Sequence, residues 1–253
     1  MQLDSYYQFF QSALSPETCQ KIIDTGLSKI KKNKEIGLST TGWTYGNMEK
    51  GSYGSKPYEG KSAGEILSKG EKLKDYYIRD SEISWLNDNW IFEEIIPLIK
   101  SANNSSGWNW EISGAEDMQF TVYNSPGGFY GWHRDGGCDN FSAYKYYIDG
   151  ISPPKNKNGR LPYGYTSKFE HVGLCRKISV TINLNSEGSY EGGNLKFDWG
   201  RHAREDNQYH ECTEIRPQGS VIVFPSHLYH CVTPVTKGTR YSLVLWALGR
   251  PFR

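Results

Sequence analysis

Long apolar runs and an excess of either charge are both missing from this 253-residue sequence. No run approaches the about 18 apolar residues that a membrane-spanning helix needs. The N-terminus also lacks a basic segment followed by an apolar one and a cleavage site. Lys and Arg number 29 and Asp and Glu number 28. We therefore expect a cytoplasmic protein, with no membrane and no nucleic acid bound through net charge.

Cysteine is scarce as well. The five cysteines are odd in number, widely spaced and without a CxxC pair, so neither a disulfide framework nor a cysteine-based zinc site is indicated. We expect reduced thiols. The sequence is instead rich in glycine, with 27 residues, and in aromatic side chains, with 18 tyrosines and 8 tryptophans. This combination is typical of a β-rich fold with many turns.

Helical periodicity is confined to the first part of the chain. Apolar residues recur at helical spacing in 14–32 and again in 88–104, which predicts two amphipathic helices. Pro97 should kink the second helix or reset its start. Between the helices, residues 33–77 show no sustained period and should be mostly loop with short strands.

Extended segments replace helices after Gly107. Runs of β-branched and aromatic residues, separated by Gly, Pro and Asn, predict strands at 118–123, 177–184, 193–199, 220–225 and 240–248. Helices followed by a sheet-rich body that closes as a sandwich or barrel indicate an α+β fold.

We expect a single domain over residues 1–253. Residues 1–107 would supply helical support and an irregular loop, and residues 108–253 the sheet core. The polar insertion at 136–176 is a candidate functional loop, because long loops in compact domains usually have a function or lack order.

A histidine and an aspartate two residues apart carry the strongest chemical signal. His133 and Asp135 follow a glycine bend in "YNSPGGFYGWHRDGG". If residues 130–135 are extended, both side chains point to the same face of the strand and can converge on one ion. The structural alternative is a strand histidine that is hydrogen-bonded to a neighbouring carboxylate.

His230 is a second candidate ligand, at the start of a predicted hairpin that turns near residues 237–238. Two histidines and one carboxylate on one side of a metal form the facial triad of non-haem Fe(II) oxygenases. His227 is the alternative to His230. A zinc hydrolase is less well supported, because no glutamate stands beside either ligand histidine as it does in HExxH.

Arg240 follows His230 by ten residues, and Ser242 is its same-face neighbour. A guanidinium binds a carboxylate through two parallel hydrogen bonds, and a nearby hydroxyl adds another donor. A metal at one end and an arginine at the other would suit 2-oxoglutarate, which is a diacid.

Together these segments resemble the Fe(II)- and 2-oxoglutarate-dependent dioxygenases, and specifically the prolyl 4-hydroxylase-like group. The matching segments are "LSPETCQKII", "RDSEISWLNDNWIFEEIIPLIKSAN", "QFTVYNSPGGFYGWHRD", "RKISVTINLNSEGSYEGGNLKF" and "FPSHLYHCVTPVTKGTRYSLVLW". The first two resemble the helical support that precedes the sheet in this group. The resemblance implies a double-stranded β-helix core, of jelly-roll or cupin-like form, with N-terminal supporting helices.

The resemblance also implies roles for individual residues. The implied Fe(II) ligands are His133, Asp135 and His230. Arg240 would pair with the distal carboxylate of 2-oxoglutarate. By the resemblance, cosubstrate contacts fall on Tyr123 and Asn183, and an aromatic position that lines the substrate pocket falls on Trp246. The pairing with Arg240 described above adds Ser242 as a cosubstrate contact. Each of these four residues has an ordinary alternative as a strand or core residue.

The reaction that the resemblance implies hydroxylates an unactivated C–H bond and converts 2-oxoglutarate and O₂ to succinate and CO₂, with ascorbate as an optional cofactor. A prolyl residue in a peptide or protein is the favoured substrate. The alternatives are a free amino acid, another small metabolite or a nucleobase, and a non-enzymatic metal-binding module on the same fold. The sequence does not indicate the oligomeric state.

Overall fold

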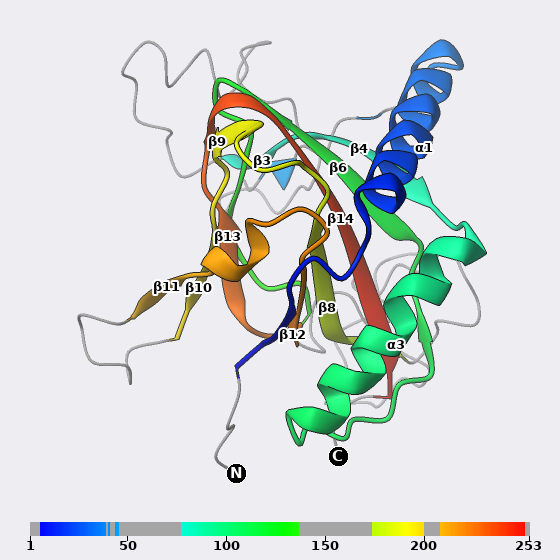
Figure 1. Ribbon diagram of the computed structural model, residues 1–253, viewed down its shortest axis with the longest axis vertical. Coiled ribbons are helices and arrows are strands. Elements are labelled where there is room, and N and C mark those ends of the chain that lie inside the picture. Colours follow the sequence, from blue (N-terminus) through cyan, green and yellow to red (C-terminus); the bar gives the residue numbers. More distant parts are fainter. Residues whose placement is uncertain are drawn as a thin grey trace, which may run out of the picture.

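The computed structural model describes residues 6–38, 40, 44–45, 77–136, 174–199 and 208–250. In this part of the chain, two long helices lie against one of two antiparallel β-sheets (Figure 1). The predicted α+β fold with a double-stranded β-helix core and supporting helices is therefore confirmed. Most of the irregular regions 33–77 and 136–176 lies outside the described residues.

The first helix, α1 (Pro16–Glu35), begins where the sequence predicts it. Ser15 precedes it in an extended conformation, and its side-chain oxygen accepts a hydrogen bond from the Thr18 N–H at 3.1 Å. Pro16 occupies the first helical position, where its missing N–H costs nothing. The sequence therefore fixes this end of the helix by local chemistry alone.

The second helix, α3 (Asn89–Ser105), runs through Pro97. The expectation that this proline could reset the start of the helix was therefore wrong. Pro97 is exposed, so water can bond the Glu93 carbonyl that loses its usual partner. The buried side chains of α3 are Ile91, Ile95, Ile99 and Ala102, all on one face.

The larger sheet has the strand order β1-β12-β8-β14-β6-β4, and β5 and β9 each pair with β14. Its strands are β1 (Gln8–Phe10), β4 (Glu82–Leu86), β5 (Gly114–Ala115), β6 (Met118–Asn124), β8 (Cys175–Asn183), β9 (Tyr190–Gly192), β12 (Val221–Pro225) and β14 (Val235–Gly249). The smaller sheet has the order β11-β10-β13-β7-β3-β2. Its strands are β2 (Thr44–Tyr45), β3 (Tyr77–Asp80), β7 (Phe129–His133), β10 (Leu195–Asp198), β11 (Tyr209–Glu211) and β13 (Tyr229–Val232).

The two faces of the larger sheet differ in polarity. One face packs against α1 and α3 through apolar side chains, such as Phe120 on β6 and Leu243 and Leu245 on β14 (Figure 1). Because side chains alternate along a strand, the residues between them point to the opposite face. On β14 these include Arg240 and Ser242, both fully buried. The sequence thus places polar groups in the space between the sheets.

Two expectations about strands were wrong. The segment 79–86 was assigned to the helical support, but it contributes β4 to the larger sheet and the end of β3 to the smaller one. The hairpin between His230 and Arg240 does not form either, since β13 pairs with β7 and β10 whereas β14 pairs with β6 and β8. The chain changes sheets at Pro234, whose carbonyl accepts from the Gly193 N–H at 3.1 Å.

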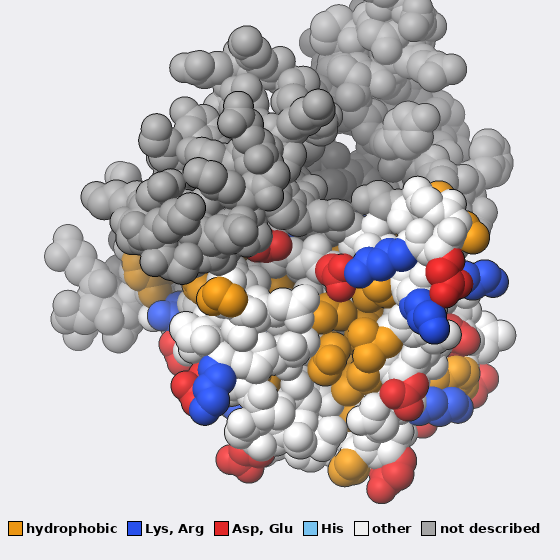
Figure 2. Space-filling model, turned by 90° about the horizontal axis from the view of Figure 1, so that it is seen from above, with side chains coloured by type: hydrophobic (Ala, Val, Ile, Leu, Met, Phe, Trp, Pro, Cys, Tyr) orange, Lys and Arg blue, Asp and Glu red, His pale blue; other side chains and the backbone are white. Residues whose placement is uncertain are grey.

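The five strands predicted after Gly107 are all present, as β6, β8, β10, β12 and β14. None of the described helices is long and apolar enough to span a bilayer. From above, the described surface shows a group of hydrophobic side chains bordered by basic and acidic ones (Figure 2). Charges of both signs are interspersed on this face, as the near-neutral composition leads one to expect.

Candidate active site

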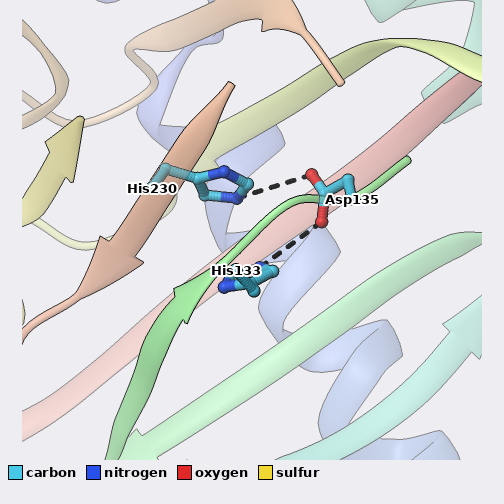
Figure 3. Close-up of side chains that lie close together, drawn as sticks. All are labelled: His133, Asp135 and His230. Carbon is cyan, nitrogen blue, oxygen red and sulfur yellow. Dashed lines mark ion pairs between the residues drawn. The ribbon is translucent and has the colours of Figure 1, made fainter. Parts of the chain in front are cut away.

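The structure brings the three predicted metal ligands together between the sheets (Figure 3). His133 ends β7 and lies directly opposite His230 on β13. The Nε2 atoms of His133 and His230 lie 3.4 and 3.5 Å from the two carboxylate oxygens of Asp135. One ligand atom from each residue lies within 4.8 Å of the others, which is close enough for all three to contact one ion.

Asp135 reaches this position from a loop, because β7 ends at His133. The sequence led us to consider an extended strand over residues 130–135, but the strand ends two residues earlier. The N–H groups of Asp135 and Gly136 both donate to the Ser226 carbonyl at 3.0 Å. This backbone contact, outside the regular strand ladder, turns the carboxylate toward the two histidines.

Backbone carbonyls fix the tautomer of both histidines. His133 Nδ1 donates to the Gly131 carbonyl at 2.7 Å, and His230 Nδ1 donates to the Leu228 carbonyl at 2.9 Å. A carbonyl oxygen only accepts, so the proton of each neutral ring is on Nδ1 and the lone pair is on Nε2. Metal-binding histidines are held in this way by partners of their second nitrogen.

Burial determines the charge of the site. Burial and the neighbouring His133 lower the pKa of His230 to about 4, so this ring is neutral at neutral pH. Burial acts to raise the pKa of Asp135, but His230, His133 and Arg176 outweigh it and hold the pKa of the carboxyl well below its ordinary value. An ionised carboxylate beside imidazole nitrogens that offer lone pairs is a suitable ligand set for a divalent transition metal.

The shifted pKa of His230 predicts that the metal-free protein loses stability as the pH falls from 6.5 to about 4. In this range the unfolded chain binds a proton at this residue and the folded chain does not, so acid favours unfolding. The full shift corresponds to about 3 kcal/mol. Urea unfolding at several pH values measures the effect.

The matched control for this prediction is His230→Gln, which removes the titrating group from the same position. Its stability should depend less on pH over this range than that of the unmodified protein. Equal pH dependence of the two proteins would contradict the assignment.

Arg240 is buried on β14, with an exposed fraction of 1%. None of its three guanidinium nitrogens has a hydrogen-bond partner among the described residues. Its guanidinium carbon lies 5.4 Å from the centre of the Tyr123 ring, which is directly opposite on β6. A buried cation without a partner is costly, so this position suits an anionic ligand.

Two tyrosines connect Arg240 with the triad. The Tyr130 ring stacks on His133 at 3.5 Å, and Tyr130 also packs with Tyr123 in one hydrophobic cluster. Tyr123 in turn lies beside the Arg240 guanidinium. Burial raises the pKa of Tyr130 to about 12, so its hydroxyl remains a hydrogen-bond donor at neutral pH. A series of contacts through these two tyrosines therefore leads from Arg240 to the triad.

Gly193 makes room for Arg240. A Cβ atom at Gly193 would lie 2.8 Å from Arg240 Cδ, and the residue has a φ of +60°. We expect Gly193→Ala to displace the arginine and to weaken 2-oxoglutarate binding by on the order of tenfold, besides costing about 1 kcal/mol of folding stability. Titration of the ligand and thermal unfolding measure the two effects.

Gly188→Ala is the control, because Gly188 has a φ of +75° but no atom within 4 Å of the added Cβ. It should cost a similar stability and leave ligand binding unchanged. Equal affinities in the two variants would show that Gly193 has no special relation to Arg240.

The other predicted site residues lie on the same inner face. Tyr123 and Trp246 are buried at 3% and 5% exposure. Ser242 Oγ lies 3.4 Å from Thr181 Oγ1. The Asn183 amide donates to the Arg216 carbonyl at 2.7 Å, so much of its hydrogen-bonding capacity is used by the backbone. Its placement favours strand stabilisation over cosubstrate contact.

His227, the alternative ligand, is exposed and lies 6.1 Å from the Trp110 ring. Sequence reasoning missed Arg79, whose guanidinium donates to Ser81, Gln119 and Thr121. These bonds join β3 of one sheet to β6 of the other. The buried residues of this segment include Arg79, Ser81 and Ser84. The sequence therefore has no apolar alternation here that could have indicated a strand.

Comparison with known proteins now identifies the family. The sequence model described as "2OG-Fe(II) oxygenase superfamily" matches residues 118–248, which is more than half of the chain. The chain belongs to this superfamily. Fe(II) and 2-oxoglutarate are the metal and cosubstrate that the superfamily implies, and the observed residues fit both. His133, Asp135 and His230 would hold the metal. The Arg240 guanidinium, which has no hydrogen-bond partner in the described part of the chain, suits a carboxylate.

The chain is similar to a PKHD-type hydroxylase of Synechococcus sp., with 35% identity over 124 residues. The match covers 49% of the chain and 38% of that protein. It is also similar to the PKHD-type hydroxylase YbiX of Escherichia coli, with 28% identity over 109 residues, which cover 42% of the chain and 38% of YbiX. The chain thus matches well under half the length of these relatives.

Solved prolyl hydroxylase structures share the fold over nearly the whole chain. A viral collagen prolyl hydroxylase from Paramecium bursaria Chlorella virus-1 superposes with a TM-score of 0.52, 17% identity, and coverage of 97% of each chain. A prolyl-4-hydroxylase of Pseudomonas putida gives a TM-score of 0.51 and 14% identity, with coverage of 98% of this chain and 95% of the other. At such identities the likeness concerns the fold.

Proposed function

We propose that the protein is an Fe(II)- and 2-oxoglutarate-dependent dioxygenase that hydroxylates a prolyl residue in a peptide or protein. The observation that carries this proposal is a His-Asp-His cluster that tyrosine contacts connect to a buried arginine, whose guanidinium has no hydrogen-bond partner among the described residues. Bound Fe(II) would activate O₂ at the expense of 2-oxoglutarate, with succinate and CO₂ as coproducts. A merely structural metal site would have no use for the arginine.

The chain's own residues would hold and orient the reactants. The three ligands hold the metal on one side, so the other side remains open to the cosubstrate. Arg240 would bind the distal carboxylate of 2-oxoglutarate through two parallel hydrogen bonds. Tyr123 and Tyr130, which pack in one hydrophobic cluster, would help to exclude water near the arginine and the metal ligands. A dry site strengthens the charge pairing.

The rim of the site supports a peptide substrate. Trp85 on β4 is 39% exposed, and its ring lies 6.0 Å from that of the inward-facing Trp246. Aromatic surfaces of this kind bind extended proline-rich segments, whose conformation is already restricted before binding. The names of the PKHD-type relatives and prolyl hydroxylase neighbours agree with this choice.

Succinate formation from 2-oxoglutarate tests the proposal. The protein, loaded with Fe(II) under air with ascorbate, would be assayed with proline-containing peptides, matched peptides with alanine in place of proline, free amino acids and nucleobases. We expect turnover to rise only with proline peptides, and mass spectrometry to find one added oxygen on the proline. Stimulation by a free amino acid or nucleobase would keep the chemistry and reject the peptide. Failure to bind either the metal or 2-oxoglutarate would reject the oxygenase.

A further inference from the structure

Asp135 lacks the strand pairing that holds the two histidine ligands. Both histidines lie on paired strands, whereas Asp135 lies two residues beyond the end of β7. Its N–H bonds to the Ser226 carbonyl on one side. On the other side, its own carbonyl accepts from Arg176 Nη1 at 3.3 Å. The position of this ligand therefore depends on contacts from outside the triad, one from the backbone of Ser226 and one from the side chain of Arg176.

The Arg176 guanidinium is itself held tightly. Its Nε and Nη2 donate to the two oxygens of Glu116, each at 2.6 Å. Its carbon lies 3.8 Å from the centre of the Trp246 ring. The Glu116 N–H donates to the Trp246 carbonyl at 2.9 Å, which links both partners of the arginine. A planar guanidinium held by a carboxylate fork and by a ring face has little freedom to move.

Close packing joins Arg176 to the same loop at a second point. A Cβ atom on Gly136 would lie 2.9 Å from Arg176 Cβ and 3.0 Å from its carbonyl oxygen. The residue after the metal ligand therefore rests directly on β8 at Arg176. Strand β8 restrains the loop through both the backbone and the side chain of this one residue.

We propose that Arg176 is a positioning residue, which sets the location of the metal ligand Asp135 through its hydrogen bond to the Asp135 carbonyl. This role rests on the proposed function, since it presupposes that the triad binds a metal. Glu116 and Trp246 hold the guanidinium in the orientation that this bond requires. Metal ligands need placement to within about 0.5 Å, and residues that orient them often affect affinity strongly.

The sign of the effect on metal affinity distinguishes positioning from simple electrostatics. A positive charge beside the site repels a divalent cation, so removing that charge should by itself tighten metal binding. Loss of a positional restraint should weaken it. Arg176→Met removes the charge and the hydrogen bond but retains a long side chain that can pack on Trp246. The two explanations therefore predict opposite results for this variant.

The test is titration of the metal-free proteins with Co(II), followed through the absorption spectrum of the bound ion. We expect Arg176→Met to bind Co(II) about 10- to 100-fold more weakly and to give a changed spectrum. The control is Arg250→Met, which removes an exposed arginine 3.9 Å from Glu111 and should bind as the unmodified protein does. Unchanged or tighter binding by folded Arg176→Met would overturn the role.

A second variant, Arg176→Lys, keeps the charge and loses the planar fork. Positioning predicts weaker Co(II) binding for it too, whereas electrostatics predicts no change. If Arg176→Met does not fold, as its unfolding curve would show, Arg176→Lys decides: affinity equal to that of the unmodified protein overturns the role. If the unmodified protein itself bound no Co(II), the proposed function would fail, and the role of Arg176 with it.

Discussion

Replacing His230 with alanine should weaken binding of Fe(II) or Co(II) by at least about a hundredfold and reduce succinate formation to background. Changes to residues that merely orient metal ligands cost about 10- to 100-fold in affinity, so loss of a ligand should cost no less. The ring is buried, it presents Nε2 to Asp135 at 3.5 Å, and its Nδ1 is fixed by the Leu228 carbonyl. Metal titration of the purified variant and the succinate assay measure both losses.

The matched control is His227→Ala, which removes another histidine three residues away. His227 is exposed and lies apart from the cluster of His133, Asp135 and His230. Metal affinity and turnover should therefore stay close to those of the unmodified protein. If His227→Ala lost the metal and His230→Ala kept it, the ligand assignment would have to be exchanged within the HxxH segment.

The sequence alone predicts those parts of the fold that depend on local chemistry. Helix α1 begins at a serine followed by proline, and its buried residues recur at helical spacing, so its position follows from neighbouring residues. The central strands have β-branched runs long enough to be recognised. Short strands such as β3 and β13 have too few residues for a period to appear, and their place depends on pairing with distant segments.

The candidate site was predictable to a similar extent. The two-residue spacing suggested His133 and Asp135 as ligands, and His230 was the third candidate. The structure brings these three residues together. The expected hairpin does not place these residues, because His230 and Arg240 belong to separate sheets. The site forms because the two sheets face each other, which no local pattern encodes.

The residues that support the site were not foreseen for the same reason. Glu116 and Arg176 are 60 positions apart, and only the pairing of β14 with β5 and β8 brings their segments together. In the sequence, a charged residue at the end of a strand looks the same whether it forms an ion pair in the fold or faces solvent. Long-range ion pairs of this kind require the structure.

Arg240→Met should have opposite effects on stability and on cosubstrate binding. The side chain is fully buried, and none of its three nitrogens is hydrogen-bonded within the described part of the chain. The buried charge therefore lowers the folding stability of the ligand-free protein. A methionine of similar length should raise the stability of that state by about 1 kcal/mol or more. The 2-oxoglutarate affinity should fall by about 2–5 kcal/mol, or on the order of 30- to several-thousand-fold.

Arg216→Met provides the contrasting control. Arg216 donates from Nη1 to the Gly192 carbonyl at 3.0 Å and to Asn194 Oδ1 at 3.3 Å, so its loss should lower stability. Its 2-oxoglutarate affinity, measured with Mn(II) in the absence of O₂, should change little. The metal affinity of Arg240→Met should also be unchanged, since the arginine is separated from the ligands by Tyr123 and Tyr130.

These comparisons decide what the buried arginine is for. If Arg240→Met became less stable, the guanidinium would be part of the structural core. If it lost the metal as fully as the cosubstrate, Arg240 would act on the triad, and the site would not be divided into a metal end and a carboxylate end. Greater stability together with weaker 2-oxoglutarate binding would mean that the folded chain retains an unfavourable charge because the ligand neutralises it. Binding energy then comes partly from relieving a cost already present in the ligand-free fold.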